Sequence, residues 1–268
     1  MPPTDDTDTL AHARARRHYE LDDVAQAYGQ RSELLPAEQT LIERHRSDLI
    51  GGRVLDIGCG GGRTSRWLAE PAASYVGLDY AARMVEQSRA RHPDLRFVQG
   101  DATTLADFAD DSIDVALFSY NGIDSMSQAM RQRTLRAVSR VLVPGGLFAF
   151  SSHNRDYQRR VRHLDPHAGL RPSALRRQLR HVISFLAVRH LEETTDEYAI
   201  WSDPRLGHGQ MSYFIAREQQ VEQLRVHGFT DTAVVAWDGT PSDPGAPDTA
   251  SMSLYYACRN GASSGAAR

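Results

Sequence analysis

One segment restricts what this chain can fold into more than any other. Residues 54–65 read VLDIGCGGGRTS, in which a short apolar run and Asp56 are followed by Gly58, Gly60 and Gly62. Glycines let the backbone turn tightly and approach a ligand closely, and the free amides of a following helix favour a negatively charged group. The segment therefore predicts a strand, a glycine loop and a helix that bind a nucleotide-like ligand, with a purely structural turn as the alternative.

The glycine spacing disfavours a nicotinamide cofactor. The dinucleotide fingerprint is G-x-G-x-x-G, whereas Arg63 stands at the third glycine position here. A nicotinamide-dependent oxidoreductase is therefore an alternative that the spacing opposes.

Strand-like and helix-like patterns alternate after the glycine loop. Apolar runs end near Asp79 and Asp101, a third spans SIDVALFSYNG, a fourth spans GGLFAFSSHN, and helical patterns separate most of them. This alternation predicts an α/β fold, doubly wound, with a parallel sheet covered on both faces. Two last runs, TDTAVVAWDG and SMSLYYACR, have no helix between them and predict an antiparallel edge hairpin, which gives seven strands in a Rossmann-like sheet.

The predicted organisation has a core flanked by smaller segments. The runs TTDEYAIWSD and HGQMSYFIA predict a further hairpin within an insertion. The expected segments are a disordered tail (1–17), N-terminal capping helices (18–50), the binding core (51–154), a helix and hairpin lid that holds the acceptor (155–215), a C-terminal helix with edge strands (216–260) and a flexible tail (261–268).

Composition excludes several classes of protein. The 268 residues are 41% hydrophobic and 24% charged, with a net charge of −3 and no apolar run of membrane-spanning length. The two cysteines, Cys59 and Cys258, provide neither a disulfide framework nor metal-ligand spacing. We therefore expect a soluble cytoplasmic protein without a metal, and the charge gives no reason to expect a nucleic-acid partner.

Five segments in order resemble the motifs of class I S-adenosylmethionine-dependent methyltransferases. They are VLDIGCGGGR, YVGLDYAARM, FVQGDATTL, SIDVALFSYNGID and RVLVPGGLFAFSSHN. The resemblance spans residues 53–154. It implies S-adenosyl-L-methionine as cofactor, S-adenosyl-L-homocysteine as product, and transfer of a methyl group to a small-molecule or peptide acceptor.

The cofactor residues follow from the motifs and from simple chemistry. Asp79 ends a strand, where its two oxygens can accept both ribose hydroxyls, although a helix N-cap is the alternative. The resemblance implies that Asp101 and the backbone of Ala102 read the adenine, with a turn aspartate as the alternative. The full expected set is Tyr28, Arg31, Asp56, Gly58, Cys59, Gly60, Arg63, Asp79, Tyr80, Met84, Asp101, Ala102, Phe118 and Ser119.

Three residues at the ends of the fourth and fifth expected strands are the catalytic candidates. His153 is the candidate general base, because imidazole titrates near neutrality, and a structural histidine is the alternative. Asn121 can hold an acceptor amine or hydroxyl, and Tyr120 offers a ring face to a cation.

Two sequence signatures that are missing from the chain narrow the class of methyl acceptor. The chain lacks the Asn/Asp-Pro-Pro-aromatic signature of adenine-N6 enzymes and the Pro-Cys dipeptide of cytosine-C5 enzymes. The Arg- and His-rich run 155–190 predicts either an anion-attracting surface, which keeps RNA as an alternative, or a solvated helical face. The expected function is methylation of a small-molecule nitrogen or oxygen by a monomer or homodimer. Another transfer from the same cofactor, or mere binding of it, is the alternative. Aromatic residues that the hairpin brings to the acceptor cavity are Tyr198, Trp201, Tyr213 and Phe214.

Overall fold

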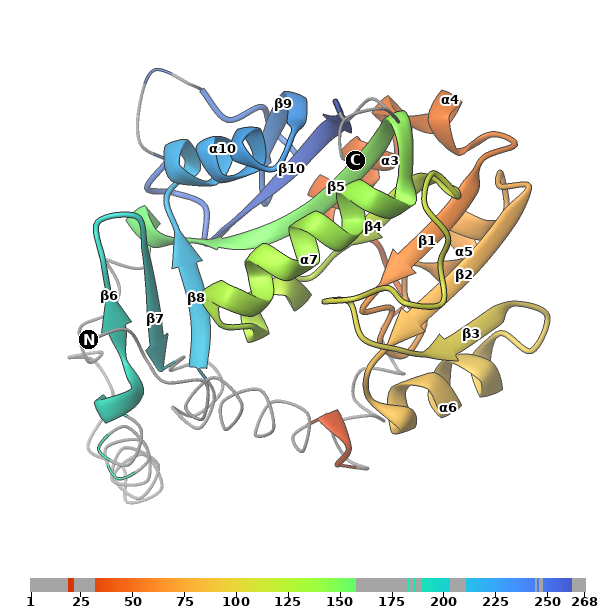
Figure 1. Ribbon diagram of the computed structural model, residues 1–268, viewed down its shortest axis with the longest axis horizontal. Helices are drawn as coiled ribbons and strands as arrows, with labels where there is room; N and C mark the ends of the chain where they lie inside the picture. Colours follow the sequence, from red (N-terminus) through yellow and green to blue (C-terminus); the bar gives the residue numbers. More distant parts are fainter. Residues whose placement is uncertain are drawn as a thin grey trace.

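The computed structural model is built around a single twisted sheet (Figure 1). It describes residues 19–21, 32–157, 183, 186, 189–202, 211–243, 245 and 248–261. Its strands are β1 (Arg53–Ile57), β2 (Ser74–Asp79), β3 (Arg96–Gln99), β4 (Ile113–Phe118), β5 (Leu142–Asn154), β6 (Glu193–Thr194), β7 (Tyr198–Ser202), β8 (Met211–Ile215), β9 (Phe229–Ala236) and β10 (Ser253–Asn260). The helices and 3-10 turns are α3 (Pro36–Arg44), α4 (Arg46–Leu49), α5 (Ser65–Ala69), α6 (Ala82–Arg91), η1 (Gly122–Ser125), α7 (Gln128–Val141), η2 (Arg189–Leu191) and α10 (Arg217–Val226).

The first five strands are parallel and lie in the order β3-β2-β1-β4-β5. Antiparallel β10 pairs with β5, and β9 pairs with β10, so the predicted C-terminal hairpin completes the sheet. The chain reverses its direction of travel across the sheet between β1 and β4, and ligands of doubly wound folds bind at the strand ends beside that switch. This topology confirms the predicted doubly wound α/β fold.

Two hydrophobic clusters cover the two faces of the sheet. Alternate strand residues divide between them: Leu55 and Ala116 pack with α7 and α10, whereas Val54 and Val115 pack with α3, α5 and α6. Figure 1 shows α7 and α10 on the near face and α3 and α5 behind the strands. Strands buried on both faces explain why these runs are almost continuously apolar.

The inserted hairpin joins the main sheet, so the sheet has ten strands among the described residues, against the seven expected. Strand β5 continues past the end of β4, and β8 pairs with this extension through His153–Phe214 and Asn154–Ile215. Because β10 pairs with the opposite edge of β5, the added strands β8, β7 and β6 extend from the edge that β4 leaves open. Residues 158–182, where lid helices are predicted, lie outside the described residues.

None of the helices in the described part of the chain is long and apolar enough to cross a membrane.

Candidate active site

A pocket lies at the carboxyl ends of β1, β2 and β4. The glycine loop and the segments that follow β2, β3 and β4 line it. All twelve expected cofactor residues that the structure describes line it, whereas Tyr28 and Arg31 lie outside the described residues. The lining residues are Tyr19, Asp56, Gly58, Cys59, Gly60, Gly61, Arg63, Thr64, Leu78, Asp79, Tyr80, Met84, Gly100, Asp101, Ala102, Phe118, Ser119, Tyr120, Gly122, Ser125 and Met126.

The glycine loop has the backbone shape that its sequence predicts. Gly58, Gly60 and Gly62 have φ angles of +62°, +55° and +75°, which side chains disfavour. A Cβ on Gly58 would lie 2.6 Å from the Phe118 ring, so the loop and β4 approach each other too closely for a larger residue. Asp56 stabilises the loop, because it accepts hydrogen bonds from the hydroxyls of Thr64 (2.8 Å) and Tyr75 (2.9 Å).

Asp79 sits at the end of β2 and faces the pocket. Its Oδ2 accepts the N–H of Gly60 and its Oδ1 accepts the N–H of Ala81, each at 2.9 Å. Each carboxylate oxygen keeps a further lone pair for a ligand hydroxyl. Burial raises the pKa of Asp79 to about 6, and the two backbone donors oppose that rise.

Asp101 and Ala102 enter the same pocket from the segment after β3. Asp101 also accepts the N–H of Thr103 at 2.7 Å, so it closes a turn as well as facing the pocket. The cofactor role and the turn role are therefore compatible here.

A short N-terminal segment contributes residues that sequence reasoning missed. Tyr19 lines the pocket and packs edge-on against Tyr80, with ring centroids 6.2 Å apart. Glu20 accepts the backbone N–H groups of Ala82 (3.0 Å) and Arg83 (3.3 Å), and so caps the start of α6. No periodicity marks this segment, because its contacts are made to a helix more than sixty residues away.

Arg63 is held inside the protein rather than solvated. Its guanidinium binds both oxygens of Glu38 on α3, and Glu38 also accepts the Ser119 hydroxyl. The Arg63 carbon Cζ lies 5.3 Å from the centre of the Tyr120 ring. Sequence reasoning missed Glu38, although its place among apolar residues one turn apart on α3 was a signal.

Tyr120 and Asn121 occupy consecutive left-handed backbone positions, with φ angles of 56° and 59°. Such angles are uncommon outside glycine and gather at functional sites. Tyr120 lines the pocket, whereas Asn121 does not. Asn121 donates its backbone N–H to Ser151 (2.7 Å) and its Nδ2–H to Ser253 (2.8 Å), so it ties the turn to β5 and β10.

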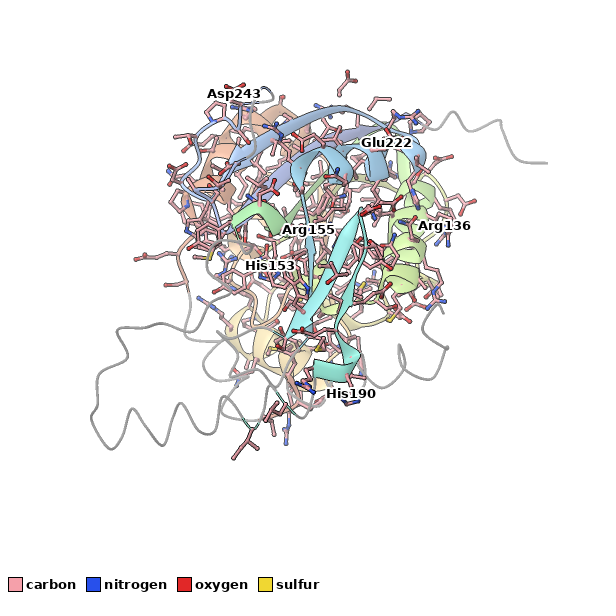
Figure 2. The ribbon with its side chains drawn as sticks, turned by 90° about the vertical axis from the view of Figure 1, so that its left-hand side faces the viewer. Arg136, His153, Arg155, His190, Glu222 and Asp243 are labelled. Carbon is pink, nitrogen blue, oxygen red and sulfur yellow. The ribbon has the colours of Figure 1, made fainter. Side chains whose placement is uncertain are left out.

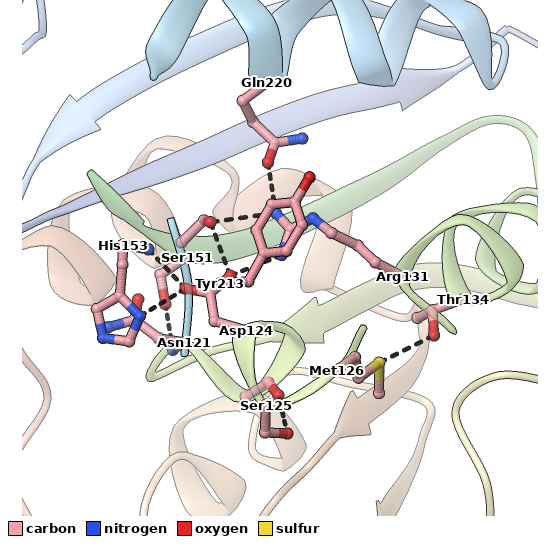
Figure 3. Close-up of polar contacts among 12 residues, drawn as sticks. Asn121, Asp124, Ser125, Met126, Arg131, Thr134, Ser151, His153, Tyr213 and Gln220 are labelled. Carbon is pink, nitrogen blue, oxygen red and sulfur yellow. Dashed lines mark hydrogen bonds and ion pairs between the residues drawn. The ribbon is translucent and has the colours of Figure 1, made fainter. Parts of the chain in front are cut away.

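His153 lies outside the pocket lining, near the end of β5, where it is paired with Phe214 of the neighbouring strand β8 (Figure 2). Its ring packs on Phe214 at 5.1 Å, and its Nδ1 lies 2.9 Å from Oδ2 of the buried Asp124. Figure 3 shows that Asp124 also meets Arg131 of α7. The expected hairpin aromatics Trp201, Tyr213 and Phe214 are buried, and neither they nor Tyr198 line the described pocket.

Comparison with known proteins identifies the core. Residues 54–146 match the family model described as a methyltransferase domain. This segment matches a methyltransferase domain, in agreement with the resemblance to class I S-adenosylmethionine-dependent methyltransferases found in the sequence.

Curated relatives resemble the methyltransferase domain and its surroundings. The demethylmenaquinone methyltransferase of Beutenbergia cavernae is 37% identical over 130 residues, which cover 47% of this chain and 52% of that protein. The fatty-acid O-methyltransferase of Mycolicibacterium smegmatis is 34% identical over 155 residues, covering 56% and 54%. The chain thus matches about half the length of these relatives.

Solved structures share the fold of the methyltransferase domain. An S-adenosylmethionine-dependent methyltransferase from Mesorhizobium loti aligns with a TM-score of 0.58 and 22% identity, covering 83% of this chain and 97% of that one. The 1,6-didemethyltoxoflavin-N1-methyltransferase of Burkholderia thailandensis, solved with S-adenosylhomocysteine, gives 0.59 and 14%, covering 97% and 92%. At these identities the likeness concerns the fold.

The residues present fit S-adenosylmethionine. Asp79 offers acceptors for the two ribose hydroxyls, and the apolar side chains of Met84 and Ala102 offer surfaces for a flat base. Gly58 and Gly60 keep the loop open beside them. The methyltransferase domain therefore has a donor and acceptor set that matches the nucleoside half of the cofactor.

Proposed function

We propose that this protein transfers the methyl group of S-adenosylmethionine to a nitrogen or oxygen of a small-molecule acceptor. The observation that carries the proposal is the pairing of Asp79 with the glycine loop. A buried carboxylate at the end of β2 is fixed by the Gly60 N–H at one wall of the pocket, and it keeps lone pairs for ribose hydroxyls.

The cofactor, when bound, supplies a methyl group that is already activated, so the protein's contribution is to bind, orient and accept a proton. Asp79, Asp101 and Met84 hold the nucleoside half. Tyr120, the η1 residue Ser125 and the following Met126 form the wall nearest the end of β4. His153 accepts the proton that the acceptor loses.

The fatty-acid O-methyltransferase relative supports an oxygen acceptor, and the demethylmenaquinone methyltransferase relatives make a quinol a second candidate to test. The hairpin of β7 and β8 packs Phe214 against the ring of His153, the proposed base.

The experiment is a transfer assay with methyl-labelled S-adenosylmethionine and a panel of hydroxy fatty acids, quinols, amines and short peptides. We expect labelled product from one acceptor class, formed together with an equal amount of S-adenosylhomocysteine. The variant Asp79→Ala should lose this activity, whereas Asp94→Asn, in an exposed ion pair with Arg66, should keep it. Cofactor binding without transfer to any acceptor class would contradict the proposal and favour a binding role.

A further inference from the structure

A buried charge cluster connects α7 to His153. Arg131 is fully buried and Asp124 is 1% exposed, and their Nη1–Oδ1 distance is 2.6 Å. Burying two charges costs free energy, and replacing such a pair with apolar residues is often neutral or stabilising. Stability alone therefore gives a weak reason for this pair.

The rest of the Arg131 guanidinium is satisfied by neutral groups. Its Nε donates to Gln223 (3.0 Å), its Nη2 donates to Ser152 (3.1 Å) and to Gln220, and the Tyr213 ring lies 4.5 Å away. Among the described residues, Asp124 is its only acidic partner. Arg131 therefore holds the negative charge of Asp124 in one place.

Asp124 is surrounded by hydrogen-bond donors. Its Oδ1 accepts Arg131 and the Ser152 hydroxyl (2.8 Å), and its Oδ2 accepts the backbone N–H of His153 (2.6 Å) (Figure 3). The Ser152 hydroxyl accepts from Arg131, so its own proton points to Asp124. A carboxyl group with these neighbours has no acceptor for a proton of its own, and so it acts as an acceptor only.

The remaining neighbour of Asp124 is the His153 ring. Nδ1 lies 2.9 Å from Oδ2, with its N–H direction off the line to the oxygen, so the contact is an ion-pair contact rather than an aligned hydrogen bond. At 2.9 Å, a lone pair on Nδ1 would nevertheless be repelled by the negative charge of the carboxylate. The neutral ring therefore carries its hydrogen on Nδ1 and keeps its lone pair on Nε2.

The lone pair lies on the accessible side of the ring. Nδ1 is buried, whereas the side chain keeps 11% of its surface exposed. Nε2 makes no hydrogen bond to another described residue and is not among the buried unpartnered atoms, so it lies on the accessible part of the ring. The same turn, η1, gives Asp124 to His153 and Ser125 to the pocket wall.

We propose that Asp124, held by Arg131, is a positioning residue that fixes His153 in its Nδ1–H form and presents Nε2 as the proton acceptor. The proposal rests on the proposed function. As the acceptor's N–H or O–H bond breaks, its electron pair stays on the acceptor atom and its proton goes to Nε2. The proton then passes to water, which restores the neutral ring.

The test is nitrogen NMR of the full chain labelled with ¹⁵N-histidine, at a pH where the ring is neutral, with His153→Gln to assign the signals. The wild-type ring should be protonated on Nδ1 only. In Asp124→Asn the amide oxygen should stay with Arg131 and turn the NH₂ toward the ring. The ring should then change to the Nε2–H form, and turnover should fall by about 10²-fold or more at unchanged cofactor affinity.

The matched control is Asp48→Asn, because Asp48 also lies beside a histidine, 3.3 Å from Nδ1 of His45, and its acidic group pairs with Arg259 rather than with Arg131. It should leave the His153 signals and turnover unchanged.

A wild-type His153 ring protonated on Nε2, or on both nitrogens, would contradict the proposal. This result needs no variant, so the proposal remains testable even if Asp124→Asn does not fold. Transfer activity is measured separately. If the wild-type protein transfers the methyl group while its His153 ring is in the Nε2–H form, only this inference is wrong. If the ring is in the Nδ1–H form but no acceptor is methylated, the proposed function is wrong and the base role with it.

Discussion

Arg63 and Glu38 join the glycine-rich loop to helix α3 through two parallel contacts, Nη1–Oε2 and Nη2–Oε1, each of 2.5 Å. The side chains of Glu38 and Arg63 are 1% and 12% exposed, so water screens this pair little. The N-terminal helix is thereby attached to one wall of the cofactor pocket. A carboxylate on the ligand would have to compete with Glu38 for Arg63.

Replacing Glu38 should destabilise the fold. In Glu38→Ala, Arg63 keeps its charge without its partner, and we expect the free energy of unfolding to fall by about 3 kcal/mol in denaturant titrations. The exposed pair Arg66–Asp94 provides the control, because Asp94→Asn should change it by less than about 1 kcal/mol. Equal effects of the two substitutions would refute this role for Glu38.

Gly58→Ala should weaken cofactor binding through a steric clash. The new Cβ would press on the Phe118 ring, and we expect the dissociation constant for S-adenosylhomocysteine to rise about tenfold or more, which corresponds to ~1.4 kcal/mol. Gly145→Ala has a similar φ of +77° but open space around its Cβ. Gly145→Ala should lower the free energy of unfolding by about 1 kcal/mol and leave the affinity for S-adenosylhomocysteine unchanged. Equal affinities in calorimetry would show that the loop tolerates the clash.

Cofactor binding should weaken below a pH of about 6. The pKa of Asp79 is raised to about 6 by burial, so the carboxylate that accepts ribose hydroxyls is lost as pH falls through that value. One such group lowers affinity by at most about tenfold per pH unit below its pKa. Burial also raises the pKa of Asp56 to about 6. Asp79→Asn therefore serves as the control. The loss of affinity below a pH of about 6 should be absent from this variant, and a loss that persists would assign the titration to Asp56.

His153→Ala should slow methyl transfer while cofactor affinity stays within about twofold. Loss of a general base costs about 10²–10⁴-fold in turnover, and the ring lies outside the pocket lining. His45, the C-cap residue of α3, is the control position, and His45→Ala should leave turnover unchanged. Unaltered turnover of His153→Ala across pH would assign the ring a structural role.

The local motifs predicted the pocket well because the residues that form it follow strand ends. Asp79 and Asp101 come directly after apolar runs, and the ends of parallel strands meet at one edge of the sheet. Ser119 and Phe118 were placed by the same reasoning. Each position depended on one strand and the turn after it, which are features that a short sequence window contains.

The contacts that sequence reasoning missed connect distant segments. Asp124 stands alone in its motif, and its meaning comes from Arg131, Gln220 and His153, which three further elements deliver. The β7–β8 hairpin was predicted, but its pairing with β5 was not. This pairing depends on β5 extending beyond the end of β4, and the pattern of apolar residues does not indicate such a difference in strand length.

The most direct test of the account is calorimetric titration of the purified protein with S-adenosylmethionine, S-adenosylhomocysteine, NAD and NADP. The pocket described above predicts one-to-one binding of both sulfur nucleotides, lost in Asp79→Ala while the melting temperature is kept, and no binding of either nicotinamide. Binding of a nicotinamide alone, or sulfur-nucleotide binding that survives Asp79→Ala unchanged, would contradict it.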